Sequence, residues 1–350
     1  MLVRILFGVY LLLIVYASLH PFSGWRHIGI SPLDYLFSPR PRTSSAFDVV
    51  VNVIAYFPFG FLCIAVLHPR VRGIPAFAVA VLGAAALSIT LEALQNYLPT
   101  RVSSNVDVLS NVAGAAIGAA AGLRLAPWLL HHGPFRRLRA IAFLPGTGVD
   151  IGLVLIGLWL LIQLNPITLL FGSGDLRDLV VPPGGRPRAP QFFVSIEAVT
   201  SAANLVVVAL LLSALIAHRR AVRPAFLGLV AVALGIKAGA FALLTRGDPL
   251  AWLTLGAQEG LAAGVLIGLA AVALPRTARL ALAAVLVMAA TVLVNLAPAN
   301  PYFTATLRLW QQGHFLNFNG LTRLVSATWP FMVLGYLFFL AAPRSREAEL

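Results

Sequence analysis

The chain has 350 residues, of which 59% are hydrophobic and only 11% are charged, and its mean hydropathy is +0.90. This composition excludes an ordinary soluble globular protein and is typical of a helical membrane protein. The formal net charge of +13 comes almost entirely from arginines between apolar runs, whereas a nucleic-acid-binding protein needs a basic soluble face. We therefore expect no nucleic-acid partner. The single cysteine, Cys63, excludes a disulfide framework.

Windows of about 20 apolar residues predict ten membrane-spanning helices. They are expected at residues 3–20, 48–67, 75–98, 106–127, 148–171, 191–217, 224–245, 249–274, 279–297 and 321–342. The first begins with Arg4 ahead of an apolar run, as a signal peptide does. Residues 18–21 offer a poor cleavage site, so we expect this helix to be retained. The predicted fold is all-α, a polytopic transmembrane helical bundle.

Arginines in the connections predict the orientation. The connections after the second, fourth, sixth and eighth spans contain arginines and no acidic residue, whereas the opposite connections mix arginine with aspartate. The positive-inside rule then places both termini in the cytoplasm. The basic stretch at residues 136–139 is also the expected boundary between a four-helix domain, residues 1–130, and a six-helix region, residues 131–350.

The most informative stretch, residues 92–118, joins two of these spans through a short polar loop. With the predicted topology, Asn52, Glu92 and Asn111 all lie roughly 7–9 Å below the outer helix ends, at about 1.5 Å per residue. A carboxylate or an amide in lipid is costly, so such residues usually have partners and a function. We therefore expect these three side chains to share one site near the outer surface.

Helical spacing directs further polar side chains to the same place. Asp107 and Asn111 are four residues apart and lie on one helix stripe, and Glu92 and Gln95 are three apart and face one way. If the three helices pack together, these stripes converge beneath the loop that holds Arg101. The candidate ligand-binding residues are Asn52, Glu92, Gln95, Arg101, Asp107 and Asn111.

Packing and capping offer simpler explanations for the neighbouring small residues. Gly114, Gly118 and Gly122 form a small-xxx-small series that lets helix backbones approach closely, and packing alone explains it. Ser104 or Asn105 has the chemistry of a helix cap. These residues therefore need no ligand to account for them.

Two alternatives also stay open for the polar residues and for the second span. Glu92 and Asp107 can be neutralised by Arg101 in a purely structural ion-pair network. The Pro-Phe-Gly sequence at residues 58–60 is either a packed kink or a break that lines a cavity.

The segment from Phe47 to Gly122 resembles the VanZ-like membrane family. The resemblance is carried by Asn52 ahead of Pro58-Phe59-Gly60, then Glu92-x-x-Gln95, Pro99 and Arg101, then Asp107-x-x-x-Asn111-x-x-Gly114. It implies a bundle of four or five helices at the cell envelope and an association with lowered susceptibility to glycopeptide antibiotics such as teicoplanin. It identifies no reaction. Beyond residue 130 the chain departs from the family pattern.

The second half carries its own charged residues within apolar runs. Lys237 and Glu259 flank the short turn at residues 245–248, and we predict that they form an intramembrane pair, because an unpaired lysine there would lose its charge or unfold the helix locally. Glu197 lies near the outer start of its span. The glycine series of this half is Gly260, Gly264 and Gly268. Glycine stripes in both halves would also permit a homo-oligomer.

The connection at residues 298–320 is long and aromatic, which favours a helix in the membrane interface or a cover over the outer pocket. Its aromatic and polar residues are Tyr302, Phe303, Arg308, Trp310, Gln311, Gln312, His314, Phe315, Asn317 and Asn319.

Three functions are compatible with these features. The favoured one is a non-enzymatic multi-pass protein of the bacterial cytoplasmic membrane, whose outer-leaflet polar pocket binds a lipid, a lipid-linked cell-wall precursor or a glycopeptide. The second is an intramembrane enzyme acting on a lipid head group, with Glu92 or Asp107 as general base and Arg101 stabilising negative charge. The third is an ion-coupled transporter that uses Glu197, Lys237 and Glu259. Scattered histidines and the absence of a phosphate-binding glycine loop predict no metal and no cofactor.

Overall fold

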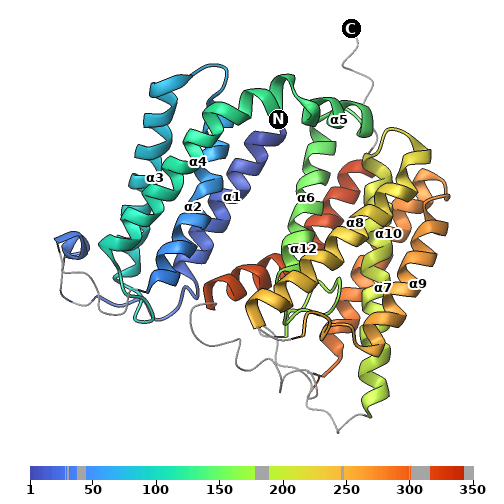
Figure 1. The fold of residues 1–350 in the computed structure, drawn as a ribbon. Coiled ribbons are helices and arrows are strands. Elements are labelled where there is room, and N and C mark those ends of the chain that lie inside the picture. The colour runs from blue at the N-terminus through green and yellow to red at the C-terminus, as the bar shows by residue number, and fades with distance from the viewer. Residues whose placement is uncertain are drawn as a thin grey trace. The chain divides into compact units, whose positions relative to one another are not determined.

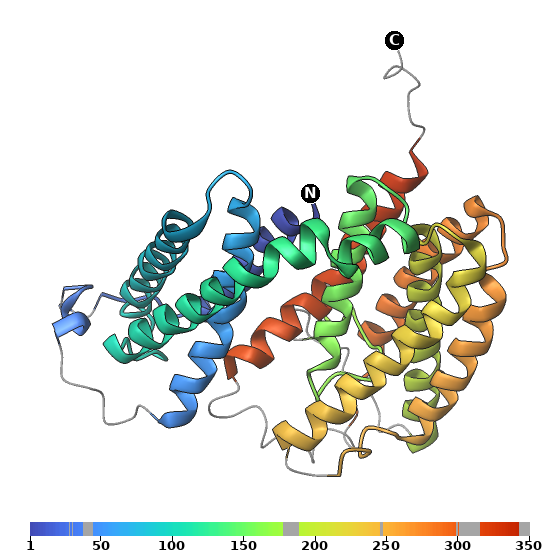
Figure 2. The same cartoon turned by 45° about the horizontal axis from the view of Figure 1, so that its top comes forward.

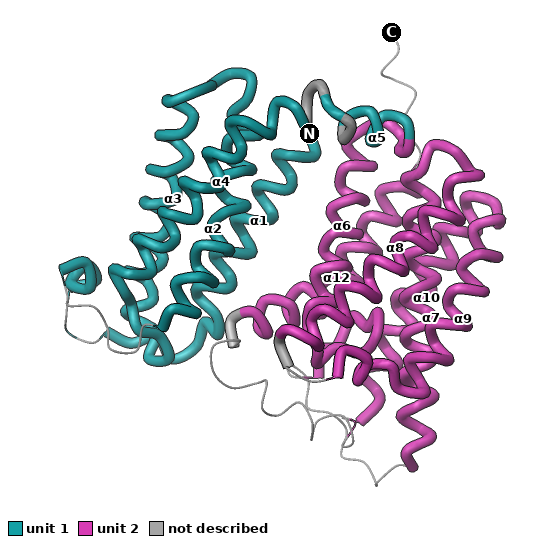
Figure 3. The backbone as a smooth tube through the Cα atoms, viewed as in Figure 1, with its two compact units in different colours: residues 1–141 teal, residues 142–350 magenta. Residues whose placement is uncertain are grey.

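The computed structural model describes residues 1–27, 29, 31–37, 45–177, 189–245, 248–298, 300 and 316–342. Helices joined by turns make up these residues and no β-strand occurs among them, which confirms the all-α prediction (Figure 1). The chain divides into two compact units, Met1–Ile141 and Ala142–Leu350, called unit 1 and unit 2 below (Figure 3). Within the predicted 298–320 connection, residues 299 and 301–315 lie outside the described residues, so its interfacial role stays a prediction.

Unit 1 is built around four long helices. They are α1 (Leu2–Leu19), α2 (Ala46–Leu67), α3 (Gly73–Gln95) and α4 (Asn105–Ala126). Shorter helical segments are η1 (Asp34–Phe37), η2 (Pro127–His132) and α5 (Pro134–Ala142). Figures 1 and 2 show that α1 and α3 end at the same end of the unit at which α2 and α4 begin. We call this the polar end of unit 1.

Serine side chains define the starts of α2 and α4. Ser45 and Asp48 form a capping box, in which each side chain accepts a hydrogen bond from the other residue's backbone N–H. Ser104 is the N-cap of α4, and its Oγ accepts a hydrogen bond of 3.1 Å from the backbone N–H of Val106. The cap predicted at Ser104 or Asn105 is therefore Ser104.

Close backbone contact joins α2 to α4. A Cβ atom on Gly114 would lie 2.3 Å from the carbonyl oxygen of Val53, and one on Gly118 would lie 1.9 Å from that of Phe57. On the opposing helix, a Cβ on Gly60 would lie 2.0 Å from a carbonyl oxygen of α4. Only glycine fits at these separations, which confirms the packing explanation. α2 is continuous through its internal proline, so the Pro-Phe-Gly sequence is packed and does not break the helix.

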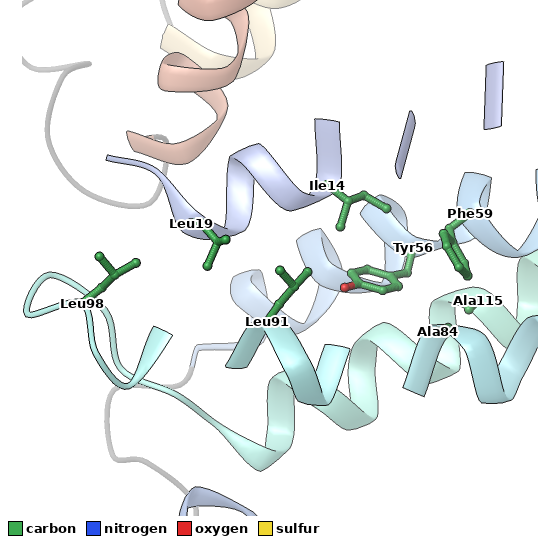
Figure 4. Packing of buried hydrophobic residues seen from close by; sticks show 8 residues of the cluster. All are labelled: Ile14, Leu19, Tyr56, Phe59, Ala84, Leu91, Leu98 and Ala115. Atoms are coloured by element: carbon green, nitrogen blue, oxygen red, sulfur yellow. The ribbon is translucent and has the colours of Figure 1, made fainter. Parts of the chain in front are cut away.

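A hydrophobic cluster holds α1 and α3 against these two helices. Figure 4 shows Ile14 of α1, Tyr56 of α2 and Leu91 of α3 around one another, each less than a tenth exposed. Leu19 and Leu98, at and beyond the ends of α1 and α3, belong to the same cluster. Apolar packing thus continues to the polar end and brings the C-terminus of α1 beside that of α3.

Unit 2 is organised around one buried helix. The described helices are α6 (Thr147–Gln163), α7 (Pro190–Leu215), α8 (Arg219–Ala240), η3 (Phe241–Thr245), α9 (Leu255–Ala271), α10 (Arg276–Leu296) and α12 (Leu316–Ala341). Most of α7 is buried, and it packs against α9 and α10, while α6 and α10 pack against α12 (Figures 1 and 2).

The predicted span at residues 148–171 is wrong in its last third. α6 ends at Gln163, and residues 164–177 continue as turns and irregular backbone, half of them buried. The Asn165-Pro166 dipeptide is the physical reason, because proline lacks an N–H and disfavours a helical conformation of the residue before it. Irregular backbone at membrane depth requires burial in protein, and residues 170–174 of this segment are all buried.

Eight of the described helices are long and apolar enough to cross a membrane. α6 and α9, with 17 residues each, are apolar but shorter. These two correspond to the remaining predicted spans, so ten crossings and cytoplasmic termini stay predictions.

Candidate functional site

The polar end of unit 1 gathers the candidate residues from α2, α3, α4 and the loop between α3 and α4. Glu92 is buried with 6% exposure, and its Oε2 accepts a hydrogen bond of 2.9 Å from the backbone N–H of Ser104. Ser103 Oγ donates to the Glu92 carbonyl oxygen at 2.6 Å. The Glu92 carboxylate therefore faces the N-terminus of α4, where free N–H groups and the helix dipole stabilise negative charge.

Arg101 and Gln95 are directed at the C-terminus of α1. The Arg101 guanidinium donates from Nε and Nη2 to the carbonyl oxygen of His20 at 3.2 and 2.5 Å, and from Nη2 to that of Ala17 at 3.2 Å. Gln95 Nε2 donates to the carbonyl oxygen of Ser18 at 2.8 Å. A cation and an amide at this position satisfy the carbonyl groups that a helix leaves without partners at its C-terminus.

Asn52 and Asp107 lie side by side across the α2–α4 contact. The Asn52 side chain forms a hydrogen bond with the Asp107 carboxylate, and the charge of Asp48 acts on the same carboxylate. The charge of Asp107 in turn acts on Glu92. Asn52 and Asp107 are both half-buried, so each keeps an accessible face. This pair is more exposed than Glu92 and Asn111, the buried members of the cluster.

Asn111 lies one helical turn below Asp107 and is buried, with 6% exposure. Its Nδ2 donates to Ser88 Oγ at 2.9 Å, and Tyr56 lies beside the same serine. Within the described part of the chain, Asn111 Oδ1 has no hydrogen-bond partner. An acceptor without a partner among the described residues is thus buried below Asp107, which is a costly arrangement.

Among the described residues, the charges that act on Glu92 are those of Asp107 and Arg101, and the charge that acts on Asp107 is that of Asp48. Burial lowers the pKa of Arg101 from its ordinary value, and the nearby Glu92 charge opposes that shift. Among the described residues, Arg101 reaches Glu92 through charge and not through a hydrogen bond. Arg101 therefore interacts with Glu92 only through charge, and its hydrogen bonds are made to the C-terminus of α1.

In unit 2, Lys237 is almost completely buried, with 1% exposure. Its Nζ donates to the carbonyl oxygens of Asn165 and Thr168, at 2.7 Å each, and to Thr168 Oγ1 at 3.2 Å. The carboxylate whose charge acts on Lys237 is that of Glu197. The predicted Lys237–Glu259 pair is wrong.

The orientation of α9 explains this correction. Its glycines face α7, since a Cβ on Gly256 would lie 2.7 Å from Val194 O and one on Gly260 would lie 2.7 Å from Ser201 Cβ. Glu259 is one residue before Gly260, about 100° around the helix, and it is exposed. The glycine stripes of α4 and α9 are thus occupied by packing within their own units, so they give no support to a homo-oligomer.

Sequence reasoning missed a buried polar network around residues 164–177. Asn165 Nδ2 donates to Asn319 Oδ1 at 2.9 Å and to Thr322 Oγ1 at 2.8 Å, and Gln163 Oε1 accepts from the backbone N–H of Phe171 at 3.2 Å. Gln163 and Asn165 are both 0% exposed. The signal was present as amide residues next to the Asn-Pro dipeptide, which marks a helix end.

Comparison with known proteins bears on unit 1. The apolar helices and the membrane-depth polar residues define a polytopic helical membrane protein. The VanZ/LLP1 family model matches residues 6–126, so this part of the chain is a VanZ-like region, as the sequence pattern indicated. The remaining C-terminal part has no family match. Searches of the curated proteins and of the solved structures found no match.

Proposed function

We propose that this protein resides in the bacterial cytoplasmic membrane and binds, at the polar end of unit 1, a head group rich in hydrogen-bond donors. The fitting ligands are the sugar and peptide portions of a lipid-linked cell-wall precursor or of a glycopeptide such as teicoplanin. Binding of either would change the susceptibility of the envelope to glycopeptides. The membrane helices and the VanZ-like region are consistent with this role.

One observation carries the proposal: the Asp107 carboxylate, a strong acceptor, stays partly exposed at the polar end, beside the half-buried amide of Asn52. The oxygen of Asn111, which has no hydrogen-bond partner within the described residues, is buried one turn deeper. Sugar hydroxyls, amide N–H groups and ammonium groups are the matching donors, and hydrogen bonds to a carboxylate are among the stronger ones.

Arg101 changes the ligand class expected from sequence. Arg101 was expected to stabilise negative charge on a head group, but its guanidinium donates hydrogen bonds to the carbonyl oxygens of Ala17 and His20. The surrounding carboxylates would repel an anion. The proposal therefore assigns the site to hydroxyl, amide or ammonium groups and gives Arg101 the task of holding α1.

The proposal is tested by titrating teicoplanin and a lipid-linked disaccharide-peptide, separately, into the full-length protein in nanodiscs. Asp107→Asn replaces an anionic acceptor by an amide, and we expect at least one of the two affinities to fall by about tenfold or more. The matched control is Asp34→Asn, which neutralises an exposed carboxylate of the same unit. Unchanged binding in Asp107→Asn, or an equal loss in the control, would overturn the proposal.

A second candidate function is an intramembrane enzyme acting on a lipid head group. It is favoured by one observation: Glu92 is held by Ser104 rather than by Arg101, and its charge interacts with that of Asp107. A base must be free of a locking cation to accept a proton. Conversion of the lipid-linked probe, followed by mass spectrometry, separates the functions. An enzyme would lose turnover in Glu92→Gln while still binding the probe, whereas a binding protein would show no conversion at all.

A further inference from the structure

The groove between α10 and α12 in unit 2 has the composition of a lipid site. It has a volume of about 260 Å³ and lies where α10 begins and α12 ends. Leu280 and Ala284 of α10 and Leu337 and Phe338 of α12 contribute apolar walls, while Arg276 lies at one end. An apolar channel with a cation at its mouth matches an acyl chain below an anionic head group.

Positive charge is concentrated at this end of unit 2. Arg276 and Arg279 are three residues apart on α10, so they share a helix face, and the charges of Arg219 and Arg276 both act on Arg279. Asp150 begins α6 at the same end, but it is buried, with 8% exposure, and is not among the charges acting on Arg279. The three guanidinium groups therefore attract an anion.

The hydrogen bonds of Arg276 leave capacity for a ligand. Arg276 is exposed and donates from Nη2 to the carbonyl oxygen of Leu340 at 3.0 Å, which ties it to the groove wall. Arg279 is held by α7, because its Nη1 donates to Ser213 Oγ at 2.7 Å and to the carbonyl oxygen of Ser213 at 3.2 Å, and it contributes its charge beside Arg276. A guanidinium has five N–H donors, and a phosphate accepts several of them together.

We infer that this groove binds an anionic phospholipid, with an acyl chain between α10 and α12 and its phosphate at Arg276, where the charges of Arg219 and Arg279 add to the attraction. The occupant follows from charge complementarity, because a zwitterionic lipid would gain the apolar contact and little from the guanidinium groups. All contributing residues belong to unit 2, so the inference is independent of the ligand of unit 1.

Native mass spectrometry of the full-length protein in detergent tests the inference, with phosphatidylglycerol and phosphatidylcholine as probes. We expect phosphatidylglycerol to bind at least about fivefold more tightly. Arg276→Gln should weaken phosphatidylglycerol binding about fivefold and leave phosphatidylcholine unchanged. The matched control is Arg220→Gln, which removes an exposed charge at the start of α8 outside the groove lining.

A second variant tests the apolar half of the site without touching charge. Ala281 lines the groove at an exposed position, so Ala281→Trp fills the groove and leaves the core intact. We expect it to weaken both lipids to a similar extent. Equal binding of the two lipids by the unmodified protein would overturn the inference, because the guanidinium groups would then make no difference. Equal losses in Arg276→Gln and Arg220→Gln would also overturn it and would show that general surface charge alone attracts the lipid.

Discussion

Both units place polar side chains at membrane depth, but the two clusters differ in how completely they are enclosed. In unit 2, Gln163 and Asn165 are 0% exposed, and Lys237, with 1% exposure, is bonded to backbone carbonyl groups. In unit 1, Asn52 and Asp107 remain half-buried. An enclosed network stabilises an irregular backbone, whereas a partly exposed cluster is the one proposed above to bind a ligand. The contrast in exposure therefore assigns the two clusters different expected roles.

The largest expected effect tests the structural role of the enclosed cluster. Lys237→Met leaves the carbonyl oxygens of Asn165 and Thr168 buried without their donor and removes the charge facing Glu197. We expect a loss of about 3–5 kcal/mol in the free energy of unfolding, seen as a large drop in the thermal unfolding midpoint in detergent.

The control for that experiment is Glu259→Gln. Glu259 is exposed on α9, so its neutralisation should change stability by no more than about 0.5 kcal/mol. Equal losses in Lys237→Met and Glu259→Gln would restore the pair predicted from sequence and contradict the structure.

Close helix packing at glycine is a feature that the two units share. Disrupting it is expected to cause the next largest loss of unfolding free energy. Gly118→Ala would place a Cβ atom 1.9 Å from the carbonyl oxygen of Phe57, so α2 and α4 must separate. We expect a loss of about 2 kcal/mol in unfolding free energy. Gly83→Ala on α3 is the matched control, because nothing lies within 4 Å of its added Cβ. A Gly118→Ala variant as stable as that control would rule out the close contact.

A smaller loss of stability is expected when Arg101 is replaced. This substitution distinguishes a residue that holds α1 in place from a residue that contacts the ligand. Arg101→Gln removes the hydrogen bonds to Ala17 and His20, at a cost of about 1.5 kcal/mol in unfolding free energy. Teicoplanin and precursor affinities should stay within about threefold of the unmodified protein's. A variant with unchanged thermal stability but lost binding would place Arg101 among the ligand contacts.

The smallest effect concerns the exposed ion pair Asp175–Arg177 of unit 2, at 2.6 Å. Burial raises the pKa of Asp175, but the hydrogen bonds and charge of Arg177 outweigh it, so the pKa lies below its ordinary value. The pair therefore stabilises the protein above the unfolded-state pKa of about 3.9, and this contribution disappears as the pH falls through the lower folded-state pKa.

Exposure of 43% for the Asp175 side chain limits this contribution to less than about 1 kcal/mol. Asp175→Asn should lower the unfolding midpoint slightly at pH 6, and the difference should shrink as the pH falls below about 3.9. A difference that grows toward low pH would have the wrong sign for a lowered pKa.

Much of the fold was predictable because apolar length and helical spacing are local properties. The glycine series at residues 114, 118 and 122 predicted close packing, and Ser104 proved to be the cap. Asn165-Pro166 marked the end of α6, but the prediction missed it. Apolar residues resume after this dipeptide and continue to Phe171, so the apolar window extended past the helix end. An apolar window measures composition and does not register a local helix break.

The sequence predicted how far along their helices the candidate residues lie, but it did not predict which partners their side chains contact. Helical rise placed Asn52, Glu92 and Asn111 at the same end of unit 1, where the structure also has them. Spacing alone could not reveal that Arg101 turns toward α1, because the carbonyl groups it contacts are 81 and 84 residues away in sequence. The same limit applies to Lys237, whose partners lie on a segment that was predicted to be helix.

Photo-crosslinking tests the central claim most directly. A lipid-linked disaccharide-peptide with a diazirine on its sugar would be bound to the full-length protein in nanodiscs, irradiated, and the crosslinked residues located by peptide mass spectrometry. We predict crosslinks at the starts of α2 and α4, around Asn52 and Asp107, and their loss in Asp107→Asn. Crosslinks confined to unit 2, or unaffected by that substitution, would contradict the account.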